Sequence, residues 1–444
     1  MAPGRPLPRR RSSSNPIRRA PHNGQDRPRR LQQPEQDRPD FSGLPEYLYQ
    51  AYERLPNFDT ASSHPLLIDA RSGRSITYSQ FRALASVLAA SMSHRLGVTS
   101  SNTVVIYSTP NIDTPVVAVA AWLLGVSVVA WAPEQSTDEL ACFGALIALP
   151  QAFFTTQALL PALMRLLGRL GASASQRPIV LLTDSGGRNA ARPENALSIQ
   201  ELYTPRPGET PFERTPLTQN QAQLYTAVIY FTISRSYEGS LVAGTPVHMD
   251  HANTISNYLE LLRPTSLVPH AAAAATANVS LEPERQTRMP PRPAHEEQSP
   301  AQARSGYHIA YSILRLNHSF LLHRIVCDIF CRGGAYLVAR SFDPAEFVDL
   351  VGRYRLKFAE LTHADVLQLI DYLNYPNPPY RQSPSSASGN NRVATALAPL
   401  RYICTDSREM EAELSPILRT LLPNVEIVCT RFGAYLDLPD QTRR

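Results

Sequence analysis

The chain has 444 residues, 43% of them hydrophobic, and a formal net charge of +5. A chain of this length can form more than one domain and bury a sizeable core. The excess positive charge lies in the first 30 residues, so the folded part lacks the basic face expected of a nucleic-acid-binding protein. Five cysteines without a secretory signal favour a reducing compartment, and we expect a cytoplasmic location.

The N-terminal segment 1–40 is rich in Arg, Pro, Ser and Gln and has no apolar periodicity, which predicts a disordered basic tail. The basic run at 9–19 fits either a nuclear import patch or phosphorylation cluster, or a solvated tail without a specific role. We favour the solvated tail.

From residue 66 the apolar pattern alternates between short strands and helices. Strands are predicted at 66–68, 75–78, 103–107, 126–131, 152–154 and 179–182. Helices are predicted at 79–97, from 113 to Gly125, from Asp138, and at 159–170. This order predicts an α/β fold with a parallel or mixed sheet.

The apolar run 115–132 is close to the length of about 18 residues that a membrane-spanning helix needs. Gly125 can end a buried helix, and the residues from Val126 to Trp131 favour a strand. We therefore predict a helix–glycine–strand unit rather than a membrane span.

The second half repeats the alternation after a predicted linker at 184–218. Strands are predicted at 227–231, 335–339, 357–361, 401–404 and 425–429, and helices at 251–262, 309–331, 343–354, 363–373 and 409–421. Residues 264–306 are of low complexity and predict a disordered insert. The expected organisation is an α/β domain over 41–438, with halves at 41–218 and 219–438, followed by a tail at 439–444. We expect two helix-covered, mainly parallel sheets.

Several segments, in their order, resemble the adenylate-forming superfamily of acyl-CoA synthetases and coumarate–CoA ligase-like enzymes. They are Ser75-Ile-Thr-Tyr-Ser-Gln-Phe-Arg, Ser108-Thr-Pro-Asn, Leu123-Leu-Gly-Val, Phe342-Asp-Pro-Ala-Glu-Phe, Arg353-Tyr-Arg-Leu and Pro423-Asn-Val-Glu-Ile-Val. The resemblance covers about 44–438. It implies activation of a carboxylic acid with ATP and Mg²⁺ through an acyl-adenylate, followed by transfer to a thiol, usually coenzyme A.

The segment matching the family's triphosphate-binding loop departs from the family pattern. The resemblance assigns Thr232, Ser234 and Ser236 to the nucleotide and leaves Arg235 as the catalytic cation, because the expected Pro-Lys-Gly is absent. Guanidinium geometry differs from that of lysine. A surface loop that binds nothing is an equally open interpretation of 232–246.

The adenine-side motif also departs from the family. Phe432 and Gly433 match the family's aromatic residue and glycine, but Leu436 replaces a glutamate that serves magnesium. Asp437, one residue later, is the candidate substitute. His308 stands where the family lines its acid pocket, although a structural histidine fits equally well.

One helical face carries His323, Cys327 and Cys331, a set that lacks a fourth zinc ligand and is typical of core residues, so we predict no metal site. The chain ends before the third subdomain and the mobile C-terminal domain that the resemblance implies. We therefore expect a truncated, diverged AMP-dependent ligase-like protein with impaired or absent activity. The alternatives are an active acid–CoA ligase, a non-catalytic module binding an acyl ligand or a protein partner, and a gene fragment.

Overall fold

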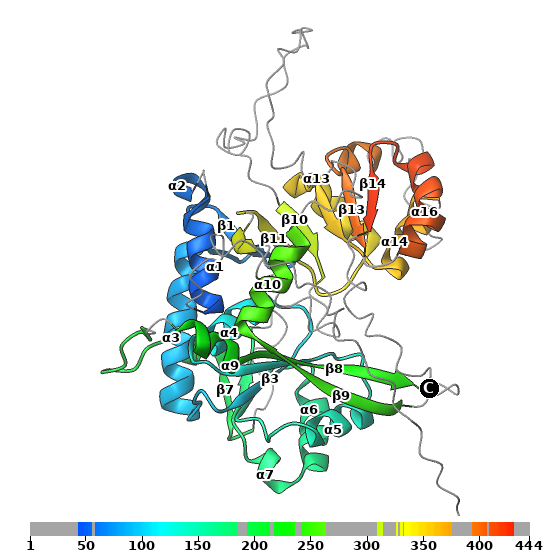
Figure 1. The fold of residues 1–444 in the computed structure, drawn as a ribbon. Helices are drawn as coiled ribbons and strands as arrows, with labels where there is room; N and C mark the ends of the chain where they lie inside the picture. Colours follow the sequence, from blue (N-terminus) through cyan, green and yellow to red (C-terminus); the bar gives the residue numbers. More distant parts are fainter. Residues whose placement is uncertain are drawn as a thin grey trace, which may run out of the picture. The chain divides into compact units, whose positions relative to one another are not determined.

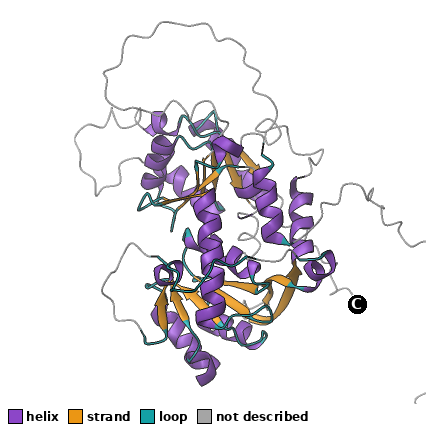
Figure 2. Cartoon of the chain, turned by 90° about the vertical axis from the view of Figure 1, so that its left-hand side faces the viewer, coloured by secondary structure: helices purple, strands orange, loops and turns teal. Residues whose placement is uncertain are grey.

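A computed structural model describes residues 43–55, 58–183, 193–213, 217–235, 241–262, 309–313, 326, 329–331, 333–374, 393–405 and 408–429. All of them belong to one unit, 41–444. The predicted disorder at 1–40 and 264–306 and the tail at 439–444 fall outside the described residues. The two sheets and their helices are seen from two sides in Figures 1 and 2.

Sheet A has seven strands in the order β14-β13-β12-β10-β11-β1-β2. Its strands are β1 (Pro65–Asp69), β2 (Ser75–Thr77), β10 (Ile309–Ser312), β11 (Ala335–Val338), β12 (Phe358–Glu360), β13 (Tyr402–Thr405) and β14 (Glu426–Cys429). All neighbours are parallel except β1 and β2, which form an antiparallel pair at one edge.

Sheet B also has seven strands, in the order β7-β6-β5-β3-β4-β8-β9. They are β3 (Thr103–Tyr107), β4 (Ser127–Trp131), β5 (Ala152–Thr155), β6 (Ile179–Leu181), β7 (Ala196–Ser198), β8 (Thr226–Arg235) and β9 (Leu241–Asp250). Only the last pair, β8 and β9, is antiparallel. The prediction of two mainly parallel sheets is confirmed.

The helices differ widely in length, from four residues in α2 and α7 to 19 in α3. They are α1 (Leu44–Glu53), α2 (Phe58–Ala61), α3 (Tyr78–Leu96), α4 (Asp113–Leu123), α5 (Thr137–Ala145), α6 (Leu160–Leu170), α7 (Ala172–Ser175), α8 (Ile199–Tyr203), α9 (Gln219–Leu224), α10 (His251–Leu262), α13 (Pro344–Tyr354), α14 (His363–Asn374) and α16 (Arg408–Leu421).

Each sheet is apolar on both faces, as parallel sheets covered by helices are. An inner core joins α1, α3 and α4 to one face of both sheets. One outer core packs α13, α14 and α16 on the other face of sheet A, and a second packs α5 and α6 on the other face of sheet B. The order of layers is therefore helix, sheet, helix, sheet, helix.

Helix ends follow the capping signals of the sequence. Helix α3 begins with a capping box at Thr77 and ends at Gly97, whose φ of 64° is left-handed. Helix α4 ends in a Schellman arrangement: Val126 N donates to Ala121 O at 2.9 Å, and Gly125 N donates to Trp122 O at 3.0 Å. Strand β4 starts two residues after Gly125, so the helix–glycine–strand prediction is confirmed.

Two predictions about local structure are wrong. The helix expected from 309 begins instead as strand β10, because a short apolar run such as Ile309–Ser312 has no period that separates a buried strand from a helix. The linker expected at 184–218 contains β7 and α8. Strand β7 is a three-residue edge strand, too short to show an alternating pattern.

Candidate functional site

The expected phosphate loop lies mostly inside an antiparallel hairpin. Strand β8 runs through Arg235, and its partner β9 begins at Leu241. Thr232 pairs with Thr245 and Ser234 with Ala243. The prediction of a loop over 232–246 is therefore wrong for 232–235 and 241–246. Each segment contains two β-branched residues, Thr232 and Ile233 in the first and Val242 and Thr245 in the second, and such residues favour extended backbone.

The pairing limits what the hairpin backbone can bind. A phosphate cradle needs successive N–H groups that converge on one point. In an antiparallel strand successive N–H groups point to opposite sides, and every second residue is bonded to its partner strand. The backbone of Thr232, Ser234 and Arg235 is held in this ladder. Ser236, the fourth expected residue of the loop, lies outside the described residues.

An aromatic pair fixes the hairpin to the rest of sheet B. Phe231 of β8 stacks on Phe143 of α5, with ring centroids 4.4 Å apart and an interplanar angle of 8°. The Trp122 indole N–H of α4 donates to Ala227 O at 2.9 Å on the opposite side of the same strand. The start of β8 is thus held from both faces of the sheet.

The remaining sequence-predicted site residues are not in the described part of the chain. His308 precedes the first described residue of β10, and Phe432, Gly433, Leu436 and Asp437 follow Cys429. Their assignments remain predictions.

The topology of sheet A marks a ligand-binding position independently of these residues. The segment joining β10 to β11 contributes Phe330 to the inner core, whereas α13 and α14, which follow β11 and β12, pack in the outer core. The connection that follows β10 therefore packs on the inner face of sheet A, whereas the connections that follow its neighbours β11 and β12 pack on the outer face. Ligands of open α/β sheets bind outside the carboxyl ends of the strands at such a switch point.

A polar pair occupies this position. Ser312, the last residue of β10, is buried, and its hydroxyl donates to Glu360 Oε2 of the adjacent β12 at 2.7 Å. Helix α14 begins just beyond β12, where buried Asp365 accepts from the Thr362 backbone N–H at 2.9 Å and from its hydroxyl at 2.7 Å. Carboxylates therefore lie at the carboxyl end of β12.

The only lysine of the chain lies at the other end of the same strand. Lys357 precedes β12 and is exposed, and its carbonyl accepts hydrogen bonds from Arg401 N and Tyr402 N, each at 3.0 Å. A strand of three residues spans about 10 Å. Lys357 therefore belongs to the amino edge of sheet A, opposite to the edge where ligands of such sheets bind.

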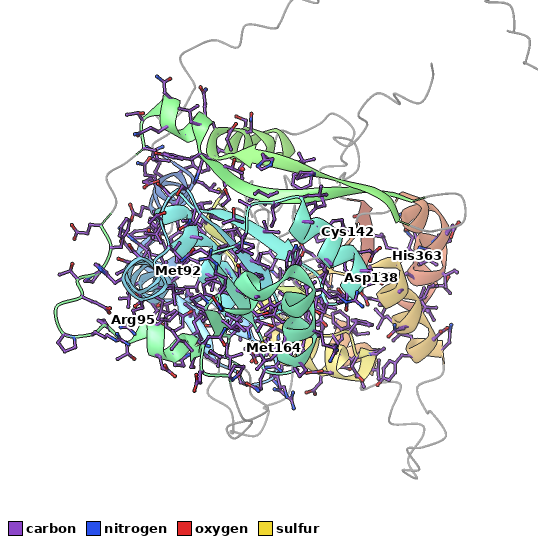
Figure 3. The ribbon with its side chains drawn as sticks, turned by 90° about the horizontal axis from the view of Figure 1, so that it is seen from below. Met92, Arg95, Asp138, Cys142, Met164 and His363 are labelled. Carbon is purple, nitrogen blue, oxygen red and sulfur yellow. The ribbon has the colours of Figure 1, made fainter. Side chains whose placement is uncertain are left out.

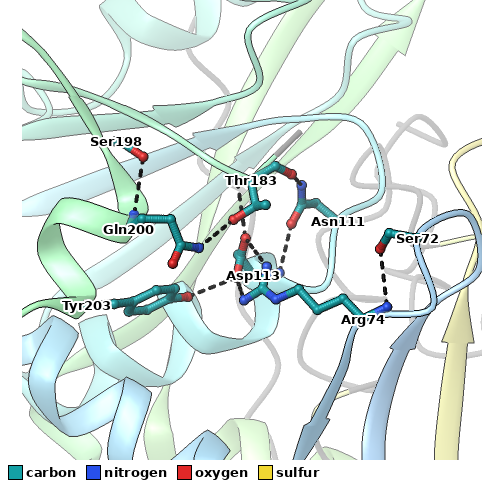
Figure 4. A network of polar contacts seen from close by, with 8 residues as sticks. All are labelled: Ser72, Arg74, Asn111, Asp113, Thr183, Ser198, Gln200 and Tyr203. Atoms are coloured by element: carbon teal, nitrogen blue, oxygen red, sulfur yellow. Dashed lines mark hydrogen bonds and ion pairs between the residues drawn. The ribbon is translucent and has the colours of Figure 1, made fainter. Parts of the chain in front are cut away.

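Sheet B has its own switch point at β3, because α4 packs in the inner core and α5 in the outer core. Two residues that follow β3, Asn111 and Asp113, belong to the network shown in Figure 4. Asp113, fully buried at the start of α4, forms a bidentate ion pair with Arg74 of the β1–β2 connection at 2.8 and 3.2 Å. The same carboxylate accepts from the Tyr203 hydroxyl at 3.1 Å and from Thr183 N at 3.2 Å.

This network joins the β1–β2 connection of sheet A to the residues that follow β3 and β6 of sheet B. Desolvation of the Tyr203 hydroxyl raises its pKa well above the ordinary value, and the charge of Asp113 raises it further. Asn111 completes the network by donating to Thr183 O at 2.6 Å and accepting from Asp113 N at 2.8 Å. Because Arg74 and Tyr203 already bind the carboxylate of Asp113, the network is a structural junction between the sheets. The Ser312–Glu360 pair of sheet A is therefore the better candidate for a ligand site.

Comparison with known proteins agrees with this fold. Residues 57–207 match the family model described as AMP-binding enzyme. The luciferase-like enzyme of the mealworm Zophobas morio superposes with a TM-score of 0.59 at 16% identity, over 88% of this chain and 73% of that one. A putative long-chain-fatty-acid CoA ligase from Rhodopseudomonas palustris has a TM-score of 0.56 at 16% identity, and the match covers 87% of this chain and 74% of that one.

The fold is that of the adenylate-forming superfamily. The resemblance stated from the sequence is thereby confirmed. The anthranilate CoA ligase AuaEII, solved with anthranoyl-AMP, has a TM-score of 0.60 at 12% identity, and the match covers 88% of this chain and 60% of the ligase. The red-emitting luciferase of Phrixothrix hirtus is covered over 61% of its length. No curated protein sequence matches the chain.

Two kinds of feature are absent from the described residues. Among them, no helix is both long and apolar enough to cross a membrane. Within the same ranges, no three His, Cys, Asp or Glu side chains gather in a way that could hold a metal ion. Cys331 is described, whereas His323 and Cys327 lie outside the described residues, so that helical set is not tested.

Sequence reasoning missed two polar pairs that lie at the switch points of the sheets. The Ser312–Glu360 pair had one visible signal, a glutamate inside the apolar strand predicted at 357–361. The Arg74–Asp113 pair had none, because its two residues lie 39 positions apart in different predicted elements.

Proposed function

We propose that this chain is a diverged member of the adenylate-forming superfamily in which ATP-dependent activation of carboxylic acids is impaired or absent. The observation that carries the proposal is the position of the only lysine, Lys357, at the amino edge of sheet A. A lysine in the triphosphate loop supplies a point charge that stabilises developing phosphate charge, and loss of such a group costs orders of magnitude in rate.

The residues present do not fit ATP with Mg²⁺ in the way that the superfamily resemblance implies. The backbone of 232–235 is paired with β9 and offers no convergent N–H groups. Leu436 replaces the expected magnesium-binding glutamate, and an apolar side chain cannot bind this ion.

Glu360 is a second argument against acid activation. The resemblance places the wall of the acid pocket directly after the segment 342–356, and β12 with Glu360 is the element that follows. A carboxylate there repels the carboxylate of an incoming acid, because like charges at short distance cannot both stay ionised without cost.

The experiment is acid-dependent exchange of pyrophosphate into ATP, measured on the full chain with Mg²⁺ and a panel of aromatic and fatty acids. We expect no exchange above the level without acid. Exchange that disappears in Arg235→Ala or Asp437→Ala would contradict the proposal and establish the alternative, an active acid–CoA ligase that uses these residues as substitutes.

A non-catalytic role in binding an acyl ligand or a protein partner is the remaining alternative. It predicts that the same acids protect the chain against thermal unfolding although none supports exchange. Unchanged unfolding temperatures with every acid of the panel would argue against the acyl-ligand form of this role.

A further inference from the structure

A cleft of about 200 Å³ opens at the carboxyl ends of β1 and β11, separated by β11 from the Ser312–Glu360 pair. Its charged lining comes from three places: Asp69 at the end of β1, Arg71 in the β1–β2 turn, and Arg340 with Glu346 on the path from β11 into α13. No site residue discussed above lines it.

The cleft exists because two parallel strands separate after their last hydrogen bond. Asp69 pairs with Val338, and Ala70 N still donates to Val338 O at 3.0 Å. The chain after β1 then turns back towards β2, whereas the chain after β11 enters α13. Diverging connections at the carboxyl ends of parallel strands form the usual ligand crevice of α/β sheets.

Both walls are held in place by local hydrogen bonds. Asp69 Oδ1 accepts from Arg71 N at 3.1 Å, from Ser72 N at 2.7 Å and from the Ser72 hydroxyl at 2.8 Å. Gly73, with a φ of 70°, completes this turn in the left-handed region. On the other wall Asp343 caps α13 by accepting from Glu346 N at 2.8 Å. A preformed cleft binds a ligand without the entropic cost of ordering its walls.

The charges of the lining determine the class of ligand. Arg71 and Arg340 line the cleft from separate walls, and the acidic residues Asp69 and Glu346 line it with them. A purely anionic ligand meets two carboxylates, and a purely cationic ligand meets two guanidinium groups. A ligand with one group of each sign has a favourable partner for both, because electrostatic complementarity penalises each like-charge contact.

We propose that this cleft binds a small zwitterion, a molecule with one carboxylate and one ammonium group that fits within about 200 Å³. The carboxylate pairs with the guanidinium group of Arg71, and the ammonium group with Glu346. The proposal is independent of acid activation, because it uses a different part of the edge of sheet A.

The test compares three probes of similar size on the full chain by isothermal titration: L-alanine, propionate and ethylammonium. We expect alanine to bind at least about tenfold more tightly than either single-charge probe, since each charge-assisted hydrogen bond contributes about that factor. Arg71→Ala and Glu346→Gln each weaken alanine binding by about tenfold.

The matched controls are Arg419→Ala and Glu413→Gln, two exposed positions on α16, and both leave alanine binding unchanged. Propionate binding as tightly as alanine, together with tighter binding in Glu346→Gln, would overturn the zwitterion in favour of a simple anion site. No binding of any probe to a folded chain would overturn the site itself. Arg71→Ala and Glu346→Gln both change exposed side chains, so circular dichroism is expected to show an unaltered fold in these variants.

Discussion

At the scale of single residues, the Arg74–Asp113 ion pair compensates a buried carboxylate. Asp113 is fully buried and Arg74 is 30% exposed, so the carboxylate depends on its partners for the solvation that it lost on folding. Removing one member of a buried pair leaves the other charge without compensation, which is more costly than the pair was favourable.

We predict that Arg74→Ala lowers the free energy of unfolding by about 3 kcal/mol. Urea denaturation followed by circular dichroism measures the change. The matched control is Arg353→Ala, whose ion pair with Asp349 is 61% and 64% exposed on one helix face. That variant should lose no more than about 0.5 kcal/mol. Equal losses of unfolding free energy in the two variants would show that the buried ion pair contributes no more to stability than the exposed one.

A second residue-scale prediction concerns pH. Arg95 of α3 (Figure 3) binds both carboxylate oxygens of Glu209, at 3.0 and 2.5 Å, and also the carbonyls of Glu201 and Thr204. The hydrogen bond from Arg95 lowers the pKa of Glu209 to about 2.

Because the pKa of Glu209 is lower in the folded than in the unfolded chain, its contribution to stability is present above about pH 5. It is lost as pH falls through the range from the unfolded value near 4.3 towards about 2. Comparing urea unfolding of the wild type with Glu209→Gln across this range should show a difference that shrinks on acidification. A difference that grows as pH falls would contradict the assignment.

At the scale of elements, two glycines differ in whether their backbone conformation requires glycine. Gly125 ends α4 with a φ of 70°, in the region that other residues enter only at a cost. Gly168 lies inside α6, and a methyl group added there would meet no atom within 4 Å.

Gly125→Ala should therefore destabilise the protein by about 1 kcal/mol, and Gly168→Ala should stabilise it by about 0.5–1 kcal/mol. Shifts of the urea midpoint in opposite directions are the expected result. A stabilising Gly125→Ala would mean that α4 does not end in the observed Schellman arrangement.

The hairpin β8–β9 depends on another element for its position. Its base is held by the stacking of Phe231 on Phe143. We predict that Phe143→Ala accelerates amide hydrogen exchange in β8 and β9 more than in β5, because a lost aromatic contact frees the edge before the centre of a sheet. Phe153→Ala, in the same outer core but on a central strand, is the control. Uniform acceleration in both variants would contradict a local role for the stack.

At the scale of the whole molecule, the inner core couples the two sheets. Phe330, from the segment between β10 and β11, contacts Tyr49, Tyr52, Tyr78 and Phe81 with ring centroids 5.1–6.1 Å apart. Those residues lie on α1 and α3, which pack in the core shared by both sheets. The halves predicted from the sequence thus share one hydrophobic interior.

Phe330→Ala should lower the free energy of unfolding by about 3–5 kcal/mol. It should also accelerate hydrogen exchange in central strands of both sheets, β11 and β3. Phe347→Ala, in the outer core of sheet A alone, should have its largest effect on β11. If Phe330→Ala affected sheet A only, the sheets would be independent units.

The sequence by itself determined the elements whose signals are local. Gly97 and Gly125 as helix ends and the alternating βα order predicted what the structure contains, because each depends on backbone conformation within a few residues, whereas the start of α3 at Tyr78, capped by Thr77, differs slightly from the predicted start at 79. The order of the family segments was also sufficient to identify the superfamily fold, although the roles of Arg235, Asp437 and the other predicted site residues remain untested.

Only the tertiary structure decided which distant residues meet. Strand β10 could not be separated from a helix, because a buried strand in the centre of a parallel sheet has no alternating pattern. The Arg74–Asp113 junction, the Ser312–Glu360 pair and the cleft between β1 and β11 each join residues brought together by strand order. That order follows from the packing of helices on two faces of each sheet. Such packing depends on the whole chain and cannot be predicted from any single position in the sequence.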